Sequence, residues 1–268
     1  APLYRKNYPH STRNNEMKTL LGEELLNSKN YREAVEILEP IPNKTESAKI
    51  AYQKVAYYRG LEFINERAFE NAIGIFLRSL QYPEDTKIEA LTRYWMAEAM
   101  YEVRKYGESV QNFETFLSMP EARHTTVYNY ANYALAYAAF NDEQYKKAAT
   151  YFERFLAGDE QDKNTINDAV TRLGDSYFVM KSYGRAMDYY DRIIAQHGPG
   201  EDYALFQRGM IQGLQGSLDT KISTLNDVLT QFPNSDFADD AAFEIAYTYF
   251  LKNDGPTAKT GLQQMIQK

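Results

Sequence analysis

Small residues recur along the chain at a nearly constant spacing, and each lies in a segment with the apolar periodicity of a helix. The intervals between successive members are 38, 37, 39, 38, 35 and 37 residues. A period of 20 to 50 residues is typical of proteins built from stacked structural repeats. The pattern therefore predicts seven repeats, whose small residues are Gly22, Gly60, Ala97, Ala136, Gly174, Gly209 and Ala246.

A second set of positions follows each small residue. About nine positions on, six of the repeats carry a ring or a bulky apolar residue: Tyr31, Phe69, Tyr106, Tyr145, Tyr183 and Leu218. Three positions later the residues are mostly small: Ala34, Ala72, Ser109, Ala148, Ala186, Lys221 and Ala258. Four positions after those they are large and apolar: Leu38, Phe76, Phe113, Phe152, Tyr190, Leu225 and Leu262. Small residues let two helices approach closely and large ones fill the groove beside them, so each repeat is predicted to be a helix, a short turn and a second, antiparallel helix.

This pattern of small and aromatic residues resembles the tetratricopeptide repeat (TPR) family over nearly the whole chain. The family unit is shorter by about three or four residues, roughly one helical turn. The longer unit, with Phe-Pro-Asn-Ser-Asp at residues 232–236, resembles the repeats of bacterial envelope proteins of the barrel-assembly lipoprotein and Tol-Pal coordinator type. The resemblance implies an all-α, right-handed superhelical solenoid of about seven helix-turn-helix repeats. It also implies a periplasmic or outer-membrane-associated location, with a cytoplasmic location left open.

The unbroken repeat favours one elongated domain over residues 14–268. Residues 1–13 are predicted to be the tail of a preceding repeat and a linker, because Tyr-Pro-His-Ser at residues 8–11 resembles Phe-Pro-Asn-Ser at residues 232–235. Neither end has the polar capping helix of a complete solenoid. We therefore expect a segment of a longer protein, in which apolar residues such as Leu262, Met265 and Ile266 permit end-to-end self-association.

Composition narrows the classes of partner and cofactor. The net charge of −7 and the pI near 5.2 do not provide the basic surface that nucleic acids require, so no nucleic-acid partner is expected. No apolar run reaches the 18 residues of a membrane span, so no transmembrane segment is expected. The chain has no cysteine, and its three histidines are isolated in predicted loops, so neither a metal nor a cofactor is expected.

The resemblance also indicates a binding surface, because the first helix of each TPR unit lines the concave face. Tyrosine rings with interspersed carboxylates suit a peptide or a protein segment that carries Lys or Arg. The alternative, that these rings fill the core between repeats, stays open at this stage. The residues carried over are Tyr94, Glu98, Tyr101, Tyr130, Tyr133, Tyr137, Phe140, Asn141, Asp168, Thr171 and Asp175, and the seventh repeat adds Phe243, Tyr247 and Phe250.

No catalytic motif stands out among the 37 acidic residues. A carbohydrate-active enzyme built from helical hairpins, or a glycan-binding lipoprotein, would place tryptophans along its sugar cleft, whereas this chain has only Trp95. The sequence therefore predicts a non-catalytic protein-interaction scaffold. A rigid spacer or a self-association module is the main alternative.

Overall fold

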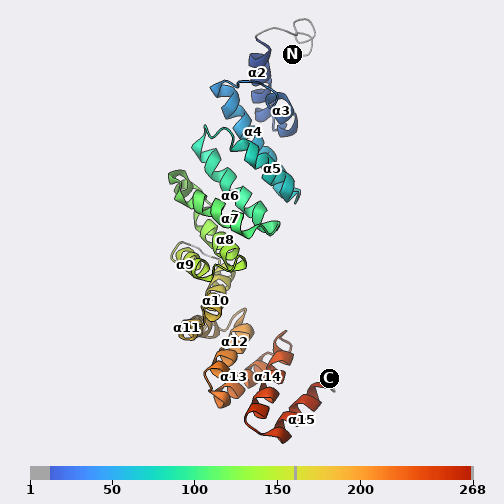
Figure 1. The fold of residues 1–268 in the computed structure, drawn as a ribbon, viewed down its shortest axis with the longest axis vertical. Coiled ribbons are helices and arrows are strands. Elements are labelled where there is room, and N and C mark those ends of the chain that lie inside the picture. The colour runs from blue at the N-terminus through green and yellow to red at the C-terminus, as the bar shows by residue number, and fades with distance from the viewer. Residues whose placement is uncertain (1–12, 160–161, 267–268) are drawn as a thin grey trace. The chain divides into compact units, whose positions relative to one another are not determined.

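A computed structural model describes residues 13–159 and 162–266 of the chain (Figure 1). Every regular element in this part is a helix, and no strand occurs in it. The chain divides into two compact units, residues 1–143 and residues 144–268, which we call unit 1 and unit 2. The predicted N-terminal tail lies outside the described residues except for its last residue, Arg13.

Unit 1 contains three helical hairpins and one further helix. The first and second helices of each hairpin pack against each other, as the sequence predicts, and neighbouring hairpins are stacked. The helices are α2 (Asn14–Asn27), α3 (Tyr31–Leu38), α4 (Glu46–Asn65), α5 (Phe69–Ser79), α6 (Thr86–Glu102), α7 (Tyr106–Ser118), the short 3₁₀-helix η1 (Pro120–His124) and α8 (Tyr128–Asn141).

Unit 2 begins with a single helix and continues with three hairpins of the same kind. Its helices are α9 (Tyr145–Leu156), α10 (Lys163–Val179), α11 (Tyr183–Ile194), α12 (Glu201–Leu214), α13 (Leu218–Gln231), α14 (Ala238–Leu251) and α15 (Gly255–Ile266). The six hairpins follow the predicted period, and α8 and α9 occupy the sequence of the fourth predicted repeat. None of these helices has both the length and the apolar character needed to cross a bilayer.

The small residues lie where the two helices of a hairpin are closest. A Cβ atom added to Gly60 would stand 2.1 Å from Cε1 of Phe76, the large residue sixteen positions later. A Cβ atom added to Gly209 would stand 2.7 Å from Cδ2 of Leu225. Ala97 and Ala136 are fully buried. The predicted pairing of small with large residues is thus confirmed and fixes the distance between the helices.

The turn inside each hairpin uses a left-handed backbone conformation. The residue seven positions after each small residue has a φ between 56° and 79°. Such a residue ends a helix by letting the following amide bond back to the last turn. Glycine is the usual choice, yet only the sixth repeat has it, which is why these turns were not evident from the sequence. The residues are Lys29, Arg67, Arg104, Glu143, Lys181, Gly216 and Asn253.

The sixth repeat accommodates a lysine at a position that is small in most repeats. Lys221 is 5% exposed, and its Nζ donates to Oε2 of Glu244 on α14 at 2.5 Å. The aliphatic part of Lys221 passes over Gly213, since a Cβ there would lie 2.8 Å from Lys221 Cδ. The glycine on α12 therefore makes room for a buried cation, and an acidic residue of the next hairpin pairs with it.

Candidate functional site

Helices α6, α7 and α8 enclose a cavity of about 230 Å³ in unit 1, which we call the acidic pocket. It combines rings and carboxylates, and no cationic side chain is among its lining residues. Five of the eleven residues expected at a binding surface line it. The full lining is Glu98, Tyr101, Glu102, Phe113, Tyr130, Tyr133, Ala134 and Tyr137.

The rings of α8 form one wall of the acidic pocket. Tyr130, Tyr133 and Tyr137 succeed one another at helical spacing, with centroid separations of 5.3 and 5.0 Å. Tyr130 is 43% exposed, whereas Tyr133 and Tyr137 are half-buried. Both interpretations of this aromatic stripe, binding groove and core, therefore apply. Part of each ring is packed against the protein and part faces the cavity.

Tyr101 and Asn141 connect the two helices at the edge of this pocket. Asn141 Nδ2 donates to the Tyr101 hydroxyl at 3.2 Å and to the carbonyl of Tyr137 at 2.9 Å. Burial raises the pKa of Tyr101, so its hydroxyl keeps its proton at neutral pH. Asn141, a predicted site residue, thus supports the pocket from outside its lining.

Glu98 is the group whose electrostatic environment is most unusual. Its Oε1 is shielded from solvent, and no described protein group donates a hydrogen bond to it. Burial raises the pKa of the Glu98 carboxyl, the Tyr94 hydroxyl lowers it by hydrogen bonding, and the negative charge of Glu102 raises it again. A buried acceptor without a donor is costly, so this carboxylate favours the approach of a cation.

Tyr94 is not available to a partner, which corrects the expectation for this residue. It is 3% exposed, and its ring contacts Trp95, Phe113 and Phe116 with centroid distances of 5.1, 5.7 and 5.5 Å. The inward side of α6 takes this ring into the core because its neighbours are all large and apolar. Tyr94 acts on the pocket only through its hydroxyl, which bonds to Glu98.

Asp175 also departs from its expected role, since it is 6% exposed and lies in a complete hydrogen-bond network. Its Oδ1 accepts from the hydroxyls of Tyr190 and Tyr203, both at 2.8 Å. Its Oδ2 accepts from Nη1 of Arg172 at 2.9 Å. The carboxylate therefore ties α10 to α11 and α12 and is a structural residue of unit 2.

The remaining predicted residues do not line the acidic pocket. Asp168 pairs with Nε of Arg172 at 3.8 Å, and Thr171 donates to the carbonyl of Asn167 in its own helix. Phe140 is half-buried on α8 and does not line the acidic pocket. The three rings of the seventh repeat are exposed on α14 and stack in sequence; they are Phe243, Tyr247 and Phe250.

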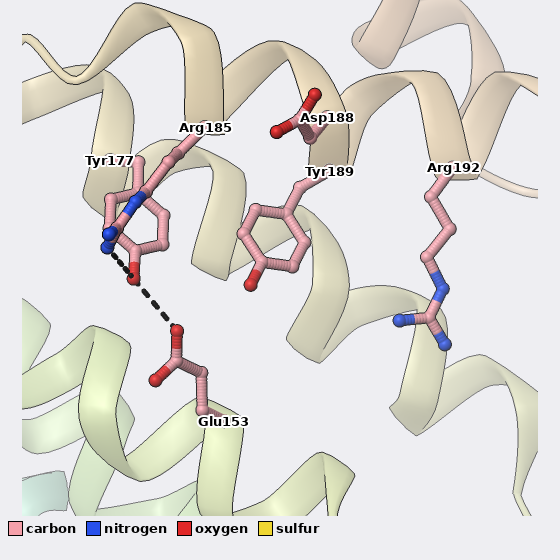
Figure 2. A pocket seen from close by; sticks show the side chains of 6 residues that line it. All are labelled: Glu153, Tyr177, Arg185, Asp188, Tyr189 and Arg192. Atoms are coloured by element: carbon pink, nitrogen blue, oxygen red, sulfur yellow. Dashed lines mark hydrogen bonds between the residues drawn. The ribbon is translucent and has the colours of Figure 1, made fainter.

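Unit 2 has a pocket of its own, of about 460 Å³, that was not foreseen from the sequence (Figure 2). Tyr177 donates to Oε1 of Glu153 at 2.8 Å, and Nη1 of Arg185 donates to the Tyr177 hydroxyl at 3.2 Å. The rings of Tyr177 and Tyr189 stack at 5.7 Å. The spacing of Arg185, Tyr189 and Arg192 places them on one face of α11. The TPR resemblance indicates a binding surface on the first helix of each repeat, whereas α11 is a second helix, so the sequence did not predict this pocket.

Figure 2 shows why this second pocket is the weaker candidate. The chain from Arg185 through Tyr177 to Glu153 pairs a cation with an anion inside the pocket, and the Asp188 side chain points away from the two tyrosine rings. The lining thus has two acidic and two basic side chains, and Glu153 and Arg185 are already linked through Tyr177. The acidic pocket of unit 1 has one acceptor without a donor, Oε1 of Glu98, in a lining of rings, which is a better basis for binding a cationic group.

Comparisons with known proteins agree with this fold. A family model for the tetratricopeptide repeat matches residues 203–235. A comparison with curated protein sequences finds no match. Among solved structures, the C-terminal part of a TPR repeat-containing protein from Cytophaga hutchinsonii is similar with a TM-score of 0.60 and 14% identity, over 93% of this chain and 94% of that one.

Two smaller TPR-like structures are also similar. YrrB, described as a TPR protein with an unusual peptide-binding site, has a TM-score of 0.52 and 22% identity, over 72% of this chain and 91% of its own. MamA has a TM-score of 0.52 and 19% identity, over 63% of this chain and 92% of its own. At these identities the similarity concerns the fold alone. The chain therefore has a TPR-like, all-α fold, which is consistent with a protein-interaction scaffold.

Proposed function

We propose that this chain is a non-catalytic scaffold that binds a basic peptide or protein segment over the acidic pocket of unit 1. The observation that carries the proposal is the combination of an uncompensated carboxylate, Glu98, with a wall of three tyrosines. Rings supply contact area at a low entropy cost, and a preformed groove spares the protein the cost of ordering. The net charge of −7 favours encounter with a basic partner.

A peptide-display selection on the full chain tests this proposal. We expect it to enrich sequences with Lys or Arg, and we expect Tyr133→Ala or Tyr137→Ala to weaken the best binder by about 1–3 kcal/mol, because central rings are frequent binding anchors. Leu214→Ala, which removes an exposed apolar side chain from α12 of unit 2, is the matched control. It should leave binding unchanged.

Melting temperatures of the same variants separate binding from folding. Lost binding with a melting temperature close to that of the parent chain supports the proposal. A large drop in melting temperature with retained binding would assign Tyr133 and Tyr137 to the core and overturn it. Enrichment of acidic or uncharged peptides would overturn the basic character of the partner.

The finer resemblance supports a location for this scaffold. The repeat of 35 to 39 residues resembles that of the barrel-assembly lipoprotein and the Tol-Pal coordinator, so we propose the bacterial cell envelope, in the periplasm or at the outer membrane. Fractionation of the native host with an antibody against this chain tests the location. Recovery with cytoplasmic markers would contradict it.

Self-association is a second proposed role, favoured by apolar side chains on α15. Leu262 is 39% exposed and Ile266 is 85% exposed. Exposed apolar residues of this kind favour contact with another copy. Leu262→Glu with Ile266→Glu should shift sedimentation toward the monomer. A parent chain that is already monomeric at high concentration would refute this role and leave the peptide-binding proposal intact.

A further inference from the structure

We propose that the acidic pocket of unit 1 selects a lysine ammonium group over an arginine guanidinium, with Oε1 of Glu98 as the acceptor that decides between them. This inference rests on the proposed function and specifies which chemical group of the partner enters the cavity. It concerns unit 1 alone, because all the residues involved belong to α6, α7 and α8.

The first argument is the number of acceptor sites on Glu98. The Tyr94 hydroxyl hydrogen-bonds to the carboxylate, and Oε1 has no donor. A guanidinium binds a carboxylate best through two parallel hydrogen bonds, one to each oxygen. Because Tyr94 already engages this carboxylate and is itself held by the core, a two-pronged approach would have to share the oxygen that Tyr94 uses. An ammonium is a compact charge that needs one oxygen at a time, so the remaining site suits it.

The second argument is the nature of the other walls. Ring faces attract a cation that lies within about 6 Å of their centroids. The rings of Tyr101, Tyr133 and Tyr137 line the same cavity as the carboxylates of Glu98 and Glu102. A guanidinium in this place would leave several of its five N–H donors without acceptors. An ammonium has three donors, so it leaves fewer of them without an acceptor when it bonds to Oε1 of Glu98.

Entry requires a small rearrangement, since Oε1 of Glu98 is shielded from solvent. Two soft motions achieve it: rotation of the Glu98 carboxylate about its terminal torsion, or rotation of the half-buried ring of Tyr133 or Tyr137. The aliphatic stem of a lysine then lies along the rings while its charged end reaches the carboxylate. This geometry also favours an ammonium with at least one N–H, because a trimethylated nitrogen has no donor for Oε1.

The test is an NMR titration of the full chain with three amino acids that are acetylated on the α-amino group and carry a methylamide at the carboxyl end. They are lysine with a free ε-ammonium, arginine, and lysine whose ε-nitrogen is trimethylated. The ring resonances of Tyr101, Tyr133 and Tyr137 report binding. We expect the lysine probe to bind at least about fivefold more tightly than either of the other two. Glu98→Gln should weaken the lysine probe at least about tenfold, as expected for loss of a charge-assisted hydrogen bond.

Glu102→Gln is the matched control, because it removes the same charge from an exposed position on the same lining. We expect it to weaken the lysine probe by no more than about threefold, with the difference vanishing at high salt. Circular dichroism establishes that each variant is folded. If Glu98→Gln does not fold, Glu98→Asp is measured instead. Its side chain is shorter by one methylene and holds the carboxylate further from the ligand, so we expect the same loss of lysine binding.

Equal or tighter binding of the arginine or trimethyllysine probe would overturn the inference, as would lysine binding that survives Glu98→Gln. Absence of any ring shift with all three probes would overturn it as well. These outcomes are separable from failure of the proposed function. In the display selection, a binder that depends on Tyr133 but tolerates replacement of every Lys by Arg would refute the selectivity and keep the scaffold.

Discussion

Glu98 in unit 1 and Asp175 in unit 2 occupy the same position of the repeat, immediately after the small residue of the first helix, yet their environments are opposite. Asp175 accepts three hydrogen bonds, from Tyr190, Tyr203 and Arg172. Glu98 is bonded to Tyr94 and has one oxygen without a donor. One carboxylate thus stabilises its unit, whereas the other costs stability and keeps one acceptor oxygen without a donor.

The sequence accounts for the difference. The third repeat has Phe113 where the fifth has Tyr190, so the hydroxyl that reaches Asp175 has no counterpart near Glu98. Trp95 likewise stands where the fifth repeat has Arg172. Only the third donor has a counterpart, since Tyr130 matches Tyr203 by position, and Tyr130 lines the acidic pocket. The residues at these two positions therefore leave Glu98 without two of the three donors that Asp175 has, which makes Glu98 a candidate binding group.

The largest expected effect is on Asp175. Asp175→Asn should lower the free energy of unfolding by about 2–4 kcal/mol, because it removes the charge that pairs with Arg172 and aims an amide donor at that guanidinium. Asp168→Asn, on the same helix and facing the same arginine from a half-exposed site, should cost less than about 1 kcal/mol. Chemical denaturation of the two variants measures both. Equal losses would show that the network around Asp175 is not special.

The next effect concerns the glycine that allows Tyr190 to reach Asp175. A Cβ on Gly174 would stand 2.8 Å from Cε1 of Tyr190, so Gly174→Ala should displace the ring and cost about 1–3 kcal/mol. Gly184→Ala in α11 of the same unit meets no atom within 4 Å and should gain about 0.5–1 kcal/mol from helix propensity. Thermal melting decides the sign of each. A gain at Gly174 would mean that the two helices separate freely.

Much of the fold was predictable because it depends on local spacing. The small residues, such as Gly60 and Ala97, and the large residues that face them follow from a periodicity that any helical repeat must obey. The turns were less evident, since charged residues such as Arg104 adopt the left-handed conformation that glycine usually provides. Nothing in the local sequence distinguishes a charged residue in that conformation from one in a helix.

The site was predictable only in part. Position within the repeat places Tyr133, Tyr137 and Glu98 together, and the structure brings them to one cavity. Position alone cannot tell whether a carboxylate is satisfied, because some of its donors come from other helices and lie up to 28 residues away, as Tyr203 does for Asp175. For this reason the sequence did not indicate that Asp175 is buried in a hydrogen-bond network.

The third prediction concerns the pH dependence that Glu98 imposes. Burial raises the pKa of its carboxyl, so the folded chain holds this proton more tightly than the unfolded chain does. The contribution of Glu98 to stability is therefore greatest below the ordinary glutamate pKa of about 4.3 and is lost as the pH rises through the raised value. Glu98→Gln removes this dependence, because its amide does not titrate.

Unfolding free energies of the parent chain and of Glu98→Gln, measured from pH 4 upward, test this sign. We expect the difference to move in favour of the variant as the pH rises and then to level off, with a gain of about 1 kcal/mol at neutral pH. A variant that becomes relatively less stable as the pH rises would mean that Glu98 is paired in the native state. Its resemblance to Asp175 would then be closer than the structure indicates.

The smallest expected effect comes from giving Glu98 the donor that Asp175 has. Phe113→Tyr places a hydroxyl at the position equivalent to that of Tyr190, and Ala97→Gly in the same chain provides the close approach that Gly174 allows in unit 2. A new hydrogen bond to a buried carboxylate is worth about 0.5–1.5 kcal/mol, from which the added flexibility of a helical glycine subtracts about 0.5–1 kcal/mol. The net change in stability should therefore be near zero, whereas Ala97→Gly alone should be destabilising.

Binding of the lysine probe should fall, because the new hydroxyl occupies the acceptor that the ammonium needs. A double variant that keeps full lysine affinity would show that Oε1 of Glu98 is not the acceptor, whereas restored stability with lost affinity would show that one hydroxyl separates the structural carboxylate from the binding one.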